Sequence, residues 1–226
     1  MVSERSLSGG RQNSIVVRVG DEVRRGPTAN EDFVVAALDH LARVDFSGAP
    51  RVRGKDSVGR LRLTYIEGTV HHGLAQPLPD AALVSTSRLV RGLHDASKGF
   101  SLLREGEVIT HGDLAENNTV FRGDEAIAFI DWDSACAGSA VFDFAHAIWA
   151  FAHLGAHGGP LGDQRRRLCL MTRSYGAPTT PEAVLNALRA RFNYALAAAG
   201  PTGAAVWQPL IDWLDLHTAE LVSRCC

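Results

Sequence analysis

The chain has 226 residues, of which 46% are hydrophobic, and its formal net charge is -2. This length suits one domain or two small lobes with a sizeable core, and the charge gives no support to nucleic acid or a membrane as a partner. The first residues lack the apolar segment of a signal peptide. The four cysteines show neither a CxxC pair nor a zinc-binding spacing with histidine. We therefore expect a reduced, cytoplasmic protein.

The first 66 residues are rich in predicted strands. Alternation, β-branched runs and turn residues predict these elements in chain order: a strand at 15–19, a hairpin partner at 22–25, a helix capped by Asn30 with apolar positions from 33 to 41, and strands at Val52 and 61–66 around the turn 54–59. This part resembles a small sheet with one helix.

From residue 79 onward the pattern becomes helical. It predicts a helix from Pro79 to Gly99, a hairpin of 119–121 with 126–130, a buried helix at 142–151, and helices at 164–175, 181–199 and 204–223. The fold class is therefore α+β. We expect an N-terminal lobe over residues 1–66 and a C-terminal lobe over residues 67–226, joined by a hinge at about 64–68.

A polar loop in the middle of the chain carries His111, Asp113 and Asn118. Phosphoryl transfer needs a carboxylate that orients the attacking hydroxyl and accepts its proton. It also needs hard oxygen ligands that hold Mg²⁺ beside the phosphates. The spacing of Asp113 and Asn118 fits such a loop, in which one tight turn brings both side chains together. Asp113 is the candidate catalytic base and Asn118 a candidate Mg²⁺ ligand.

Two further aspartates follow the apolar run 126–130. Asp131 is expected at the end of that strand, beside the loop, as the second Mg²⁺ ligand. Asp133 would lie on the same face of an extended chain, where it either binds the metal or braces the loop. The alternative to a phosphoryl-transfer site is a polar turn, because aspartate and asparagine are good turn formers.

Residues 111–118 and 130–133 resemble the catalytic signature of the aminoglycoside phosphotransferase and choline kinase superfamily. Residues 143–145, Asp-Phe-Ala, are similar to a second motif of that family, and a weaker likeness extends over most of residues 7–155. The resemblance implies a two-lobed, protein-kinase-like fold. It also implies a phosphotransferase that binds ATP or GTP in the cleft between the lobes and uses Mg²⁺.

The resemblance also implies roles for residues outside the loop. Tyr65 and Ile66 would offer backbone hydrogen bonds to the purine, although both also fit an ordinary strand core. Gly9 and Gly10 would let the backbone approach the phosphates, although such a pair is also common in plain turns. His111 would support the loop rather than react. Asp143 would hold the loop through backbone hydrogen bonds or cap its own helix.

Kinases of this type usually place a lysine on the third strand of the N-terminal lobe, and this chain offers none there. Lys55 is predicted in a turn and Lys98 at a helix end. Arg24 and Arg25 are the candidates, and strand alternation lets only one face the cleft. We favour Arg25, with a solvated strand charge as the alternative. Glu31 either pairs with that arginine or simply favours the helix N-terminus.

The acceptor is expected to be a small molecule with a hydroxyl group. Three functions stay open: an aminoglycoside phosphotransferase that confers antibiotic resistance, a metabolic kinase for choline, a sugar or a similar alcohol, and a nucleotide-binding protein without transferase activity. Aminoglycosides are polycations, so the first function needs acids in the helical part, and the candidates are Glu116, Asp212, Asp215 and Glu220. The alternative for these acids is a solvated helix face.

Overall fold

The computed structural model describes residues 4–6, 16–73 and 77–223. Strands and α-helices follow in this order: β1 Arg5–Ser6, β2 Val16–Val19, β3 Glu22–Arg25, α1 Glu31–Arg43, β4 Val52–Lys55, β5 Leu61–Thr64, α2 Asp80–Ala96, β6 Val108–Thr110, β7 Thr119–Arg122, β8 Glu125–Phe129, β9 Cys136–Gly138, α3 Ala140–Phe151, α4 Leu161–Tyr175 and α5 Pro181–Val222. Short 3₁₀ turns cover Glu116–Asn118 and Trp132–Ser134. The fold is α+β, as predicted.

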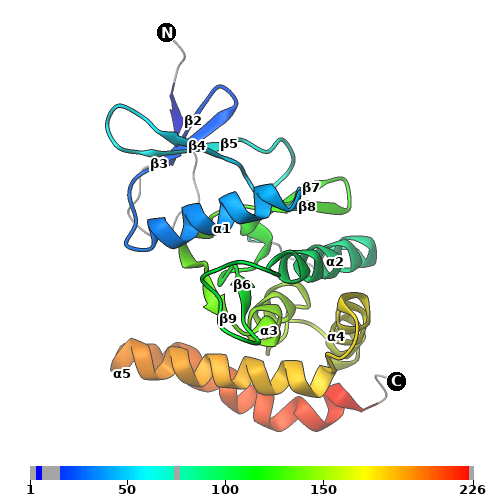
Figure 1. The fold of residues 1–226 in the computed structure, drawn as a ribbon. Helices are drawn as coiled ribbons and strands as arrows, with labels where there is room; N and C mark the ends of the chain where they lie inside the picture. The colour runs from blue at the N-terminus through cyan, green and yellow to red at the C-terminus, as the bar shows by residue number, and fades with distance from the viewer. Residues whose placement is uncertain (1–3, 7–15, 74–76, 224–226) are drawn as a thin grey trace.

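A five-stranded antiparallel sheet forms one end of the molecule, with α1 beneath it (Figure 1). The strand order is β1-β2-β3-β5-β4. Alternation along β5 buries Leu61 and Leu63, and they join one hydrophobic cluster with Leu38 and Leu41 of α1. The sheet therefore holds α1 in a fixed position between itself and the helical part of the chain.

The rest of the described chain is mainly helical: α2 packs against β6 and β8, α3 packs against β6, and α4 and α5 pack on these helices (Figure 1). The predicted hairpin of β7 and β8 is confirmed. Gly200, with φ 62° and ψ -161°, interrupts the helical geometry of α5. The two helices predicted on either side of this glycine are therefore present and joined at a kink.

Asn30 is the N-cap residue of α1, as predicted, but its side chain makes no capping bond; its Nδ2 donates instead to the carbonyl oxygen of Ala135 at 2.5 Å. Two local predictions are wrong. Lys55 is the last residue of β4 rather than part of a turn. Residues 131–133 are not extended, because Asp131 is left-handed at φ 61° and a 3₁₀ turn follows it.

The cysteines depart partly from the expectation. Cys136 is free and exposed, whereas Cys169 is disulfide-bonded, so the prediction of a wholly reduced chain is wrong for this residue. Among the helices of residues 16–73 and 77–223, none combines the length and the apolar character that a membrane crossing needs.

Candidate active site

The candidate catalytic loop, residues 111–118, lies between β6 and β7, and the carboxylate of Asp113 within it is held from two sides. The Nδ2 of Asn118 donates to the carbonyl oxygen of Asp113 and to its Oδ2, both at 2.9 Å. The Nε2 of His146 lies 3.3 Å from Oδ1 of Asp113. The hydrogen bond with His146 is the main cause that lowers the pKa of Asp113 to about 2, and Asn118 adds to it. Asp113 is therefore an oriented anion at neutral pH.

His111 is fully buried and links the loop to the end of β8. The backbone N–H of Asp113 donates to Nδ1 of His111 at 3.3 Å, so Nε2 carries the proton and donates to the carbonyl oxygen of Ile130 at 2.9 Å. Burial lowers the pKa of His111, so the ring stays neutral. The N–H of Ile130 in turn donates to the carbonyl oxygen of Asn118 at 2.9 Å. His111 is thus a supporting residue with no free ring nitrogen for chemistry.

Asp143, in the first turn of α3, anchors the start of the loop. Its Oδ2 accepts the backbone N–H of His111 at 3.0 Å, and its Oδ1 accepts that of Gly112 at 2.8 Å. Behind it, Nε2 of His94 lies 3.2 Å from Oδ2, and Nδ1 of His94 lies 2.7 Å from the hydroxyl of Tyr175. Burial raises the pKa of Tyr175 to about 12, so its hydroxyl keeps its proton. Tyr175 therefore donates to His94, and His94 donates to Asp143.

Asp143→Ala is expected to destabilise the fold by about 3–5 kcal/mol, because it leaves two buried backbone N–H groups and His94 without their partner. Urea unfolding measures this loss. Asp95→Ala is the matched control, since the Asp95 carboxylate is 62% exposed in its pair with Arg91; it is expected to cost under about 1 kcal/mol. Equal losses in the two variants would contradict the anchoring role.

The same network makes the stability of the fold depend on pH. Burial alone raises the pKa of Asp143, but the hydrogen bond from His94, electrostatic attraction to the His94 and His111 rings, and the N–H of Gly112 lower it overall. A carboxyl whose pKa is lower in the folded state stabilises the fold fully above its unfolded pKa of about 4. This contribution is lost as the pH falls from about 4 through the folded value. The stability of Asp143→Ala is therefore expected to depend less on pH in this acidic range than that of the wild type.

Asp131 and Asp133 converge on Arg25 of β3. The Nη2 of Arg25 lies 3.7 Å from Oδ1 of Asp131, and it also contacts Oδ1 of Asp133. Burial lowers the pKa of Arg25, while the charges of Asp131 and Glu31 oppose this shift. The reasoning from an extended chain was wrong for residues 131–133, yet the left-handed turn at Asp131 still leaves both carboxylates beside one guanidinium.

Arg24 points elsewhere: its guanidinium lies 3.8 Å from carboxylate oxygens of Glu22 and Asp56. Only Arg25 is buried and reaches the aspartates that follow β8. The suggested partner of Arg25 also differs, because Glu31 forms its ion pair with Nζ of Lys55 at 2.5 Å. The first residue of α1 is thus held by the end of β4, and Oε2 of Glu31 is buried without a hydrogen-bond partner.

The residues proposed to bind Mg²⁺ suit that ion by their donor chemistry. Among the described residues, no cluster of three or more histidine, cysteine, aspartate or glutamate side chains is able to hold a metal alone. Mg²⁺ typically takes one or two protein carboxylates, with phosphate and water oxygens completing its octahedron. The half-exposed carboxylate of Asp131 and the Oδ1 of Asn118 are hard oxygen donors of this kind. A site with few protein ligands therefore fits.

The residues predicted to contact the nucleotide differ in how far the structure leaves their backbone groups available. The backbone N–H of Tyr65 donates to the carbonyl oxygen of Asp21 at 2.7 Å, so only its carbonyl remains for a purine. The Tyr65 ring lies under the guanidinium of Arg18, 3.6 Å from its Cζ. Ile66 follows immediately and lies outside any strand. Gly9 and Gly10 fall outside the described residues.

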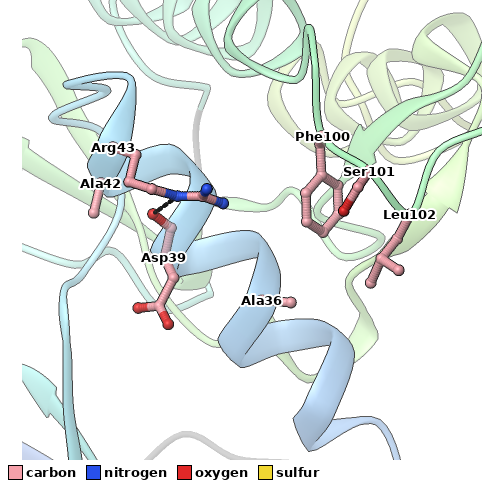
Figure 2. A pocket seen from close by; sticks show the side chains of 7 residues that line it. All are labelled: Ala36, Asp39, Ala42, Arg43, Phe100, Ser101 and Leu102. Carbon is pink, nitrogen blue, oxygen red and sulfur yellow. Dashed lines mark hydrogen bonds between the residues drawn. The ribbon is translucent and has the colours of Figure 1, made fainter.

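Sequence reasoning missed His146, His94 and Tyr175, which all act on the loop from helices. One signal was present: His146 follows Asp143 at i,i+3 spacing, so both lie on the same face of α3. An open surface hollow of about 600 Å³ lies elsewhere, between α1 and residues 100–102 (Figure 2). Its lining includes none of the predicted site residues.

Comparison with known proteins connects this geometry to a family. Residues 100–177 match the family model of the phosphotransferase enzyme family. This segment contains the catalytic loop, Asp131, Asp133 and Asp143, so the predicted resemblance is confirmed. No curated protein sequence matches the chain.

Solved structures agree on the fold along nearly the whole chain. A spectinomycin phosphotransferase, solved with ADP and spectinomycin, has a TM-score of 0.63 at 12% identity. The match covers 99% of this chain and 93% of that chain. The GDP complex of aminoglycoside 2'-phosphotransferase-IIIa has a TM-score of 0.62 at 14% identity, covering 96% and 94%. A choline/ethanolamine kinase family protein from Mesorhizobium loti has a TM-score of 0.55 at 13% identity, covering 98% and 88%. The fold is therefore the two-lobed, protein-kinase-like one.

Proposed function

We propose that this protein transfers the γ-phosphate of ATP or GTP to a hydroxyl group of a small molecule. The observation that carries the proposal is the convergence on Asp113, whose carboxylate is held by Asn118 and His146 and kept anionic. The match of residues 100–177 to a phosphotransferase family supports a kinase-type enzyme. The acceptor expected from the sequence is an aminoglycoside.

In this reaction, Asp113 acts as the catalytic base that orients the acceptor hydroxyl and takes its proton. Because its pKa is near 2, it is a weak base, which suits a loose transition state in which positioning matters more than early proton removal. His146 acts as a positioning residue, since its contact to Oδ1 fixes the direction of the carboxylate. His111 and Asp143 hold the loop in this geometry.

Asn118 and Asp131 are the proposed Mg²⁺ ligands. When bound, Mg²⁺ neutralises charge on the transferring phosphoryl group. Residues 1–66 are proposed as the nucleotide-binding lobe and residues 67–226 as the catalytic and substrate-binding lobe, with the hinge at about 64–68. The backbone of Tyr65 and Ile66 is proposed to contact the purine, and Gly9 and Gly10 the phosphates.

Arg25 is proposed to take the place of the usual lysine and bind the nucleotide phosphates. Arg25→Met is therefore expected to weaken Mg²⁺-nucleotide binding about 10- to 100-fold, since hydrogen bonds to charged groups contribute about 1.5–3 kcal/mol. Isothermal titration with Mg²⁺-ADP and Mg²⁺-GDP measures the change. Arg24→Met is the matched control on the same strand, because Arg24 faces Glu22 and Asp56; its affinity should stay within about 2-fold of wild type. Equal losses in both variants would count against Arg25.

A protein that binds nucleotide without transferring phosphate is the second candidate. The absence of the usual lysine favours it, whereas the intact set of Asp113, Asn118 and Asp131 opposes it. A panel of alcohols incubated with Mg²⁺-ATP separates the two functions, because only a transferase forms a phosphate ester.

A further inference from the structure

Arg191 of α5 lies beside the reaction centre. Its Nη2 donates to the carbonyl oxygen of Gly112 at 2.5 Å, and Gly112 directly precedes Asp113. Its Cζ lies 5.3 Å from the ring centroid of Phe142. Burial lowers the pKa of Arg191, but a guanidinium is still charged at any physiological pH. A fixed positive charge therefore borders the place where an acceptor hydroxyl must meet Asp113.

Arg191 is half-buried, and no carboxylate of the described residues forms an ion pair with it. The hydrogen bond to Gly112 uses one of five N–H groups of the guanidinium. Arg189, two positions earlier on the same helix, is the contrast. Its guanidinium is 53% exposed and pairs with Asp215 at 2.8 Å. The charges of Asp143 and Asp113 act on Arg191 without direct pairing, so its guanidinium keeps donors that an anionic ligand would satisfy.

The acids that a polycationic acceptor needs are mostly engaged within the protein. Glu116, on the catalytic loop, lies 3.1 Å from Nε2 of His153. Asp215 pairs with Arg189, and Asp212 accepts a hydrogen bond from Gln208 at 2.8 Å. Glu220 is exposed near the end of α5. Of these four acids only Glu220 is not engaged, so a polycation at Asp113 would meet the charge of Arg191 with little compensation from them, which disfavours such an acceptor.

We propose that the acceptor is a small hydroxy acid, and that Arg191 binds its carboxylate while Asp113 receives its hydroxyl. Arginine and carboxylate match in geometry through two parallel hydrogen bonds. A carboxylate carries one negative charge, so its repulsion from Asp113 and from the γ-phosphate is smaller than that of a phosphate ester. This inference rests on the proposed phosphotransfer and replaces the aminoglycoside with a different class of acceptor.

The reaction then balances as an alcohol phosphorylation. The oxygen of the alcohol group of the hydroxy acid forms a bond to the γ-phosphorus. The bond between that phosphorus and the oxygen bridging to the β-phosphate breaks. The hydroxyl proton passes to Asp113 and then to solvent. The products are a phosphorylated hydroxy acid and a nucleoside diphosphate. The carboxylate on Arg191 stays unchanged throughout.

Three compounds that differ in charge at one end provide the test: glycerate, glycerol and 3-amino-1,2-propanediol. Phosphate-ester formation from Mg²⁺-ATP and Mg²⁺-GTP is followed by ³¹P NMR, and kcat/KM is measured for each compound. We expect glycerate to exceed glycerol by about 30-fold or more, and the amine to be the poorest. In Arg191→Met the ratio of glycerate to glycerol should fall to about one. Because both compounds are measured on the same variant, their ratio of kcat/KM values is unaffected by a general loss of activity that follows from the missing contact with Gly112. Arg189→Met should keep the wild-type ratio.

A preference for the amine, or an unchanged ratio in Arg191→Met, would overturn the inference while leaving phosphotransfer standing. If no compound is phosphorylated, calorimetry measures whether glycerate binds to the complex of the protein with Mg²⁺-ADP. Glycerate binding that is absent, or that persists in Arg191→Met, overturns the role of Arg191. Failure of Mg²⁺-ADP itself to bind would instead refute the proposed function.

Discussion

Asp113→Ala is expected to abolish phosphoryl transfer, with kcat lower by about 10²- to 10⁴-fold, which is the usual contribution of a positioned general base. The substitution removes the carboxylate that His146 and Asn118 hold, so the acceptor hydroxyl loses both its orientation and its proton acceptor. The nucleotide is held by other residues in this proposal. Mg²⁺-nucleotide affinity is therefore expected to stay within about 3-fold of wild type, since the change removes no proposed nucleotide or metal ligand.

Single-turnover ester formation and calorimetric nucleotide binding separate the two effects. Asp124→Ala is the control, because Asp124 is an exposed residue in the turn between β7 and β8; it should behave like wild type. Transfer by Asp113→Ala at a near wild-type rate would exclude Asp113 as the base. A loss of nucleotide affinity equal to the loss of rate would instead indicate that the substitution disrupts the loop.

The core of the candidate site was predictable because its parts are close in sequence. Asp113 and Asn118 belong to one short loop, and the hairpin of β7 and β8 returns the chain to Asp131. Residues 16–25 were equally predictable, since a β-branched run, a Gly-Asp pair and a second short run dictate a hairpin. In both cases local turn chemistry decides which side chains meet.

Contacts between distant elements were not predictable in the same way. Lys55 follows Gly54 and looks like a turn residue, but β4 extends to it through a register shift between Val52 and Lys55. That shift gives Lys55 its contact with Glu31. Periodicity does not encode such a bulge, because it depends on how β4 pairs with β5.

The helix residues that hold the loop in place were also not predictable from the sequence. Arg191 of α5 contacts the loop directly, whereas His94 of α2 and Tyr175 of α4 act on it through Asp143, and these contacts form only once the helices have packed. On the sequence alone, each is one polar residue among many on an amphipathic helix. Asp143 was recognisable from its motif, but its partner His94 was not. The packing of α2 against α4, rather than any pattern along either helix, brings His94 and Tyr175 together.

Asp131→Ala is expected to weaken Mg²⁺-nucleotide binding by about 100-fold or more, since loss of even an outer-shell partner costs metal sites about 10- to 100-fold. The effect should depend on the metal. Without Mg²⁺, nucleotide affinity is expected to be unchanged or slightly higher, because Arg25 loses a competing carboxylate 3.7 Å away and gains freedom to contact phosphate.

Calorimetric titration of ADP and GDP, with Mg²⁺ and with EDTA, measures both affinities in wild type, Asp131→Ala and the control Asp124→Ala. The opposite behaviour in the two buffers is the signature of a metal ligand, because a misfolded site would lose both affinities together. If Asp131→Ala weakens metal-free and Mg²⁺-bound nucleotide equally, Asp131 supports Arg25 rather than the metal. If neither affinity changes, the site after β8 does not bind the nucleotide, and the convergence of Arg25, Asp131 and Asp133 is a structural ion pair.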